Sequence, residues 1–232
     1  MIELLQIEIM KYKFSKLVYT FLLYLLLMFV LLFLLGVSTG GIYMFDTMET
    51  AIRETNNALI WPGCIVITGI WSNKIIVQEF KERTIQIVFS TGVKRQKIML
   101  AKIAFTIIFS FAFALLSTFI LDLYLSNIAE YTYYAEAAKG YWGRDGIKDI
   151  IVKAGLPVLL ISFAGLLPAA LGITKYSSSI TYGVSIILAL LWSMQIGFAA
   201  PLLSTAGIRV LLFLCAIGGG IYIIAFCKRR DL

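Results

Sequence analysis

Few side chains in this sequence could carry chemistry. Histidine is absent, which excludes Ser-His hydrolases, His-ligated zinc or haem sites and most acid–base schemes at neutral pH. The three cysteines, Cys64, Cys215 and Cys227, are far apart and show neither a metal-ligand spacing nor a disulfide pattern. No GxxxxGK[ST] segment occurs, so the chain has no phosphate-binding loop. We therefore expect no catalytic, cofactor-binding or metal-binding residue in this chain.

Ionisable residues are also rare inside the long apolar stretches. Only Lys74, Asp122 and Arg209 come near the membrane interior, and each lies toward the end of its stretch, where we expect the side chain to reach water. The lack of deeper ionisable residues disfavours both an ion-coupled carrier and an intramembrane enzyme. A transport pathway without them would suit an amphipathic or hydrophobic substrate, such as a peptide, an antibiotic or a lipid-like compound.

Charged residues with a regular spacing follow the second apolar stretch, in residues 78–90. On a helix, four polar side chains fall within one arc of about 100°: Glu79, Glu82, Arg83 and Gln86. Phe80, Thr84, Ile87 and Val88 lie on the opposite side. Gly92 is typical of a helix C-terminus, and a basic run suited to anionic lipid headgroups begins at Lys94. The spacing predicts a short amphipathic helix at the membrane surface, with a charged side that a soluble partner could bind.

The amino-acid composition indicates the class of protein to which this predicted helix belongs. Of the 232 residues, 60% are hydrophobic and 14% are charged, whereas a soluble domain has about 25% charged residues. The mean hydropathy is +0.92. These values exclude an ordinary soluble enzyme, a disordered chain and a nucleic-acid-binding domain. We predict an all-α integral membrane protein with a single transmembrane domain.

The apolar stretches predict six transmembrane helices, because a bilayer core needs about 20 apolar residues per helix. The predicted spans are 17–36, 58–77, 103–125, 154–174, 177–196 and 205–227. Residues 1–16 are predicted to form an amphipathic interfacial helix before the first span. Pro157 and Pro168 are expected to kink the fourth span. For the short connection 197–204, the sequence does not distinguish a loop from a re-entrant segment.

The basic residues predict the orientation of the spans. With both termini inside, 14 of the 20 Lys and Arg residues lie on the inner side and 6 on the outer side. Because cytoplasmic loops carry the excess of Lys and Arg, the count predicts an N-in, C-in topology. Residues 78–90 are then cytoplasmic, and residues 126–153 form an extracellular segment.

The cytoplasmic stretch has a sequence pattern that resembles a known family. It comprises Glu79-Phe80-Lys81-Glu82-Arg83-Thr84, then Ser90-Thr91-Gly92-Val93-Lys94-Arg95, then Ile98 and Lys102. This pattern, between spans two and three, resembles the membrane (permease) subunits of type-2 ATP-binding-cassette (ABC) exporters. Arg83 stands where that family commonly has Gly, and Lys94 where it commonly has Ser.

The resemblance implies a function and a set of partners. Residues 78–90 would be the coupling helix that docks into a separate ABC ATPase subunit, which binds ATP and Mg. The implied ATPase-coupling residues are Glu79, Phe80, Glu82, Arg83, Thr84 and Ile87. A second permease subunit, identical or related, would complete the pathway, and the assembly would lie in the cell membrane of a bacterium. The alternative is a non-transporting membrane partner, such as an immunity or sensor-associated subunit.

Overall fold

A computed structural model describes residues 14–39, 48–82, 95–130, 144–193 and 205–229. Every regular element within them is helical, which agrees with the predicted all-α class. The predicted interfacial helix 1–16 lies outside the described residues except for its last three, and the open question about 197–204 also falls outside them.

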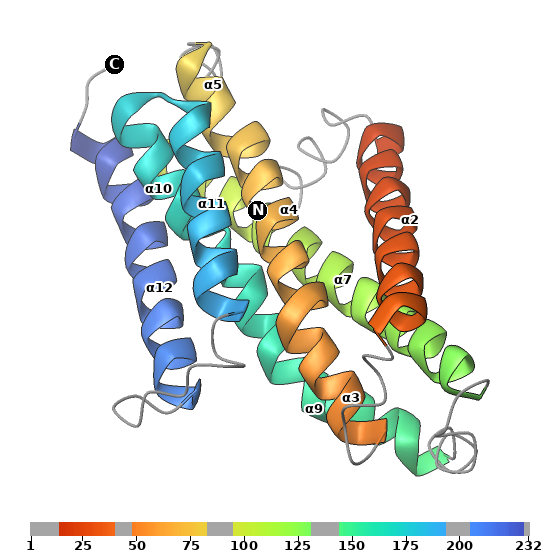
Figure 1. Cartoon of the computed structure of the whole chain (residues 1–232). Helices are drawn as coiled ribbons and strands as arrows, with labels where there is room; N and C mark the ends of the chain where they lie inside the picture. Colours follow the sequence, from red (N-terminus) through yellow and green to blue (C-terminus); the bar gives the residue numbers. More distant parts are fainter. Residues whose placement is uncertain (1–13, 40–47, 83–94, 131–143, 194–204, 230–232) are drawn as a thin grey trace.

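The helices follow one another in an up-and-down order (Figure 1). In chain order they are α2 (Phe14–Thr39), α3 (Met48–Thr55), η2 (Asn56–Ile60), α4 (Trp61–Ser72), η3 (Asn73–Val77), α5 (Gln78–Lys81), α7 (Arg95–Glu130), α9 (Arg144–Ala164), α10 (Leu166–Lys175), α11 (Ser178–Ser193) and α12 (Thr205–Arg229). We call the end of the bundle that holds α5 and the α10–α11 turn the α5 end, and the opposite end the α3 end.

Four stretches are long and apolar enough to cross a membrane: Ile52–Lys81, Arg95–Leu125, Ala154–Lys175 and Arg209–Cys227. Two further apolar stretches, Val18–Leu34 and Ser178–Ser193, are shorter in the described part of the chain. The four long stretches overlap the second, third, fourth and sixth predicted spans, which agrees with a multi-pass membrane protein. The count of six spans stays a prediction. The orientation from the charge count stays a prediction.

The second apolar stretch is longer than the sequence predicted. The elements from α3 to α5 follow one another without a gap in a single course that crosses the whole bundle (Figure 1). The helix therefore does not end at residue 77, because Gln78–Lys81 continues it without a gap. Two π-helical segments, η2 and η3, flank α4. Pro62, which has no N–H to donate, lies in the first turn of α4 directly after η2.

The fourth predicted span has one interruption. Helix α9 ends at Ala164 and α10 begins at Leu166, with Gly165 as a turn between them. Pro168 follows in the first turn of α10, where its missing N–H leaves one backbone bond of the preceding turn unmade. Pro157 lies inside α9, which continues through it, so the helix is interrupted near Pro168 and not at Pro157.

Helix α11 packs closely against its neighbours. Tyr176 adopts a left-handed conformation with φ of 51°, and Ser177 N–H donates to the Gly172 carbonyl at 3.1 Å, which is the pattern of a Schellman turn. A Cβ on Gly69 of α4 would lie 2.6 Å from Cβ of Ser185 on α11. The close contact between α4 and α11 therefore requires glycine at position 69.

Helix α2 lies at the edge of the bundle beside α7 (Figure 1). The Tyr24 hydroxyl donates to the carbonyl of Ile60 at 2.9 Å and lies 3.5 Å from Sγ of Cys64. Cys64 in turn lies 3.2 Å from Oγ of Ser117 on α7. These contacts join three helices through buried polar atoms, and Cys64 serves as part of that packing.

Candidate functional site

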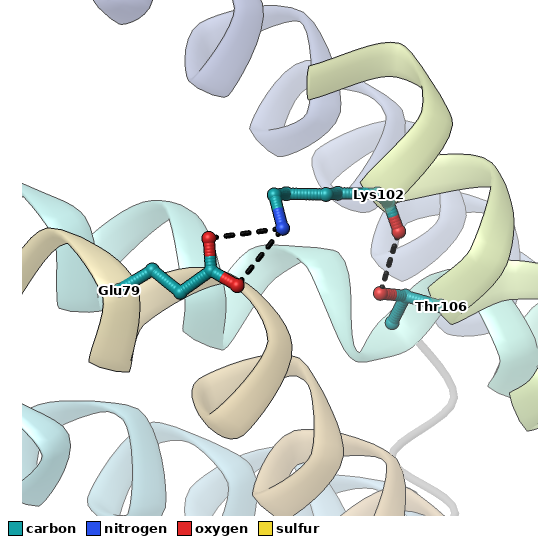
Figure 2. A network of polar contacts seen from close by, with 3 residues as sticks. All are labelled: Glu79, Lys102 and Thr106. Atoms are coloured by element: carbon teal, nitrogen blue, oxygen red, sulfur yellow. Dashed lines mark hydrogen bonds and ion pairs between the residues drawn. The ribbon is translucent and has the colours of Figure 1, made fainter. Parts of the chain in front are cut away.

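The most deeply buried ion pair in the described residues joins the second and third apolar stretches at the α5 end. Lys102 Nζ of α7 donates a hydrogen bond to Oε1 of Glu79 on α5 at 2.9 Å and lies 2.9 Å from Oε2 (Figure 2). The side chains are 0% and 7% exposed. Because a buried ion pair leaves a costly isolated charge when either partner is removed, Glu79 and Lys102 fix α5 against α7.

The backbone around Lys102 supports this contact. The Thr106 hydroxyl donates to the Lys102 carbonyl at 2.9 Å, one turn along α7 (Figure 2). This bond satisfies the buried Thr106 hydroxyl within its own helix. The Lys102 ammonium extends toward α5, where it pairs with the Glu79 carboxylate.

The orientation of α5 differs from the predicted one. Glu79 was expected on the solvent-facing side of an amphipathic helix, and this expectation is wrong, since Glu79 is buried against α7. Phe80 is buried as well, with its ring centroid 6.5 Å from that of Tyr176 and 6.3 Å from that of Phe226. Its contacts join α5 to the end of α10 and to α12.

The residues that directly follow Phe80 are exposed. Lys81 and Glu82 are exposed, and Glu82 Oε1 accepts a hydrogen bond from Nε2 of Gln78 at 2.7 Å. Of the six predicted coupling residues, the structure therefore brings Glu79 and Phe80 into the bundle and places Glu82 outside it. Arg83, Thr84 and Ile87 lie outside the described residues.

A second polar cluster lies toward the α3 end. The Arg209 guanidinium of α12 donates to Oδ1 of Asn57 in η2 at 2.7 Å. It also lies 5.8 Å from the ring centroid of Trp61 and 5.1 Å from that of Trp192, within cation–π range. The second span is thus tied to α12 near one end and to α7 at the other.

Asn56, the neighbour of Asn57, contacts α7 instead of α12. Its side chain is hydrogen-bonded to the Asp122 carboxyl of α7. Asp122 was expected to reach water from the end of its span, which is wrong, because Asp122 is only 1% exposed. Helix α7 continues to Glu130, so Asp122 lies inside the helix and not at its tip.

Sequence reasoning missed several of these residues. Lys102 entered the count of basic residues and the family pattern but not the predicted coupling residues, although it lies inside the apolar run Ile98–Phe105, where a lone cation signals a partner. Asn56 and Asn57 also begin an apolar run, and adjacent amides at that position were an available signal. The pairing of these residues required the tertiary structure.

The helices and this site define a helical multi-pass membrane protein without an internal nucleotide-binding motif. A family model described as "ABC-2 family transporter protein" matches residues 4–196. The match covers most of the chain, and the chain therefore belongs to the ABC-2 transporter family, as a membrane permease of that family. No curated protein and no solved structure matches the chain.

Proposed function

We propose that this chain is the permease subunit of an ATP-driven exporter, with a separate ABC ATPase subunit that binds ATP and Mg. The family match carries the proposal. The arrangement of the α5 end supports it, because this end holds a buried ion pair at the base of a segment whose next residues are exposed.

In this proposal the residues of the coupling segment 78–90 have two kinds of role. Glu79 and Phe80 hold the base of the segment against α7, α10 and α12. Glu82, Arg83, Thr84 and Ile87 contact the ATPase. Movement of the ATPase would then be transmitted to the second span directly, since α5 continues that span without a break.

The membrane environment and the partners follow from the surfaces of the bundle. Large apolar side chains are exposed on α2, α11 and α12, including Leu26, Ile187 and Leu214. Such faces suit contact with lipid or with another apolar helix. We propose a six-span, N-in, C-in subunit in the bacterial cell membrane that pairs with a second permease subunit.

The proposed substrate is an amphipathic or hydrophobic compound, such as a peptide, an antibiotic or a lipid-like molecule. A small cavity between α4 and the last four helices has mostly apolar lining residues, including Leu160, Leu188 and Leu212, with Trp192 and Arg209 as its polar members. The cavity has room for about one water molecule, so it shows only that the interior between these helices is apolar. The substrate proposal rests on the scarcity of ionisable residues in the apolar stretches.

A charge reversal tests the exposed part of the coupling segment. We expect the double variant Glu82→Lys/Arg83→Glu to reduce substrate export about tenfold or more, because reversing charges at a docking surface opposes association and a loss of about 1.4 kcal/mol is tenfold. Export from intact cells and ATP hydrolysis by the purified complex are measured together, with the amount of inserted protein as reference.

The matched control is Lys97→Glu, which reverses an exposed charge on α7 near the same end and should leave export unchanged. Unaltered export in the double variant, at equal protein level, would contradict the docking role. A wild-type chain that binds an ATPase without moving any substrate would instead favour the non-transporting partner.

A further inference from the structure

Asp122 is a buried carboxyl with no cationic partner among the described residues. The ion pairs within the described part of the chain involve Glu54 and Glu79, and none reaches Asp122. Its one hydrogen-bond partner is the side chain of Asn56, and its Oδ1 atom is buried without a partner. An ionised carboxylate in this position would carry an uncompensated charge inside an apolar bundle, which costs several kcal/mol at least.

The surroundings of Asp122 offer acceptors instead of cations. Oδ1 of Asn56 is buried without a hydrogen-bond partner, as is Oγ1 of Thr118, one turn earlier on α7. Asn56 uses its amide N–H to bind Asp122, since its own oxygen stays unpaired. An ionised carboxylate has only acceptor atoms, so it can accept from the Thr118 hydroxyl but leaves the Asn56 oxygen without a donor.

Among the described side chains of the neighbouring elements, no charged or titratable group neutralises Asp122. On α3, Arg53 is exposed and pairs with Glu54 at 3.3 Å. On α12, Arg209 donates to Asn57. Cys64 of α4 and Tyr24 of α2 contact each other and Ser117. The part of α9 whose side chains are described, residues 154–164, has no ionisable residue.

We propose that Asp122 binds a proton inside the bundle and forms a neutral acid–amide pair with Asn56. The proton adds to a carboxylate oxygen, and the resulting O–H is a donor that can bind the Asn56 carbonyl oxygen. Asn56 N–H continues to donate to the other Asp122 oxygen. One proton thereby removes the buried charge and supplies the donor that the Asn56 oxygen lacks.

Protonation of Asp122 is linked to the packing of the second span against α7. Asn56 lies in η2 of the second span and Asp122 lies in α7, so separation of these elements would expose the acid to water. Carboxyl groups in water are ionised near pH 7. The site therefore keeps its proton while the two elements are packed and releases it when they part. This inference concerns the chain alone and does not depend on the ATPase partner.

Infrared difference spectroscopy of the purified full chain in lipid tests the proposal. The wild type should show the C=O stretch of a protonated carboxyl near pH 7, and the band should be lost in Asp122→Asn. It should persist in the matched control Glu54→Gln, which removes a partly exposed acid of the neighbouring α3. The swap Asn56→Asp/Asp122→Asn exchanges the acid and the amide, and it should restore the band.

Asp122→Asn should also fold and keep the thermal stability of the wild type. Its amide N–H can donate to Asn56 and its oxygen can accept, which reproduces the bonds of the neutral acid. The absence of the band from the wild type, or its persistence in Asp122→Asn, would overturn the proposal. Failure of Asp122→Asn to fold, or a sodium-dependent rise in wild-type stability at constant pH, would also overturn it and favour a carboxylate that binds a cation.

Discussion

Lys102→Met should destabilise the chain by about 3–5 kcal/mol, the cost of removing one partner from a buried ion pair. The Glu79 carboxylate would then stay buried without its cation. The measurement is equilibrium or thermal unfolding of the purified chain in a mild detergent. We expect export to fall with stability, since α5 loses its attachment to α7.

A second variant separates the lost pair from the lost lysine. Glu79→Gln/Lys102→Met removes both charges, and it should recover most of the stability, because replacing both members of a buried pair is often nearly neutral. Lys97→Met, on the exposed side of the same helix, should have little effect. Equal stability of Lys102→Met and Lys97→Met would contradict the structural role of the pair.

Phe80→Ala should be similarly disruptive, at about 3–5 kcal/mol, as is usual for truncation of a buried aromatic side chain. The ring contacts Tyr176 at the end of α10 and Phe226 on α12. Its loss would free the coupling segment from two helices, so we expect ATP-driven export to fail even in molecules that remain folded. Unfolding and the ratio of transport to ATP hydrolysis are measured on the same preparation.

Phe80→Leu provides the control because it keeps most of the buried volume and should retain most of the export. The two variants distinguish an anchoring role from direct contact with the ATPase. Export that is preserved in Phe80→Ala would show that the ring does not position the coupling segment.

The hydropathy of the sequence was sufficient to predict the class and the approximate spans. The four long candidate spans overlap four of the predicted apolar runs, since the length of an apolar helix is set by the bilayer. The family resemblance, drawn from residues 78–102, agrees with the family match over residues 4–196. Both predictions depend on features that are local in the chain.

The direction of individual side chains could not be predicted in the same way. The helical wheel for residues 78–90 assumed a helix that starts at residue 78 and has solvent on one side. The helix instead continues from η3, and Glu79 faces Lys102 of α7, which compensates its charge inside the bundle. The cytosol-facing position predicted for Glu79 was therefore wrong.

The polar contacts between distant parts of the chain could not be predicted from the sequence either. Asn57 and Arg209 are 152 positions apart, and Glu79 and Lys102 are 23 apart. Each of these residues is recognisable as a polar group near an apolar run. Their pairing depends on which helices are neighbours and on how η2 turns its two asparagines toward different helices.

The central claim is that this permease works with an ATPase supplied by another chain. The most direct measurement is mild-detergent purification of the tagged wild-type chain from its native cells, followed by labelling with a photoreactive ATP analogue and an ATPase assay. The account predicts a co-purifying, labelled subunit whose hydrolysis is present in the eluate. An eluate that contains the intact permease, with no nucleotide-binding chain and no ATP hydrolysis, would contradict it and leave the non-transporting partner as the better explanation.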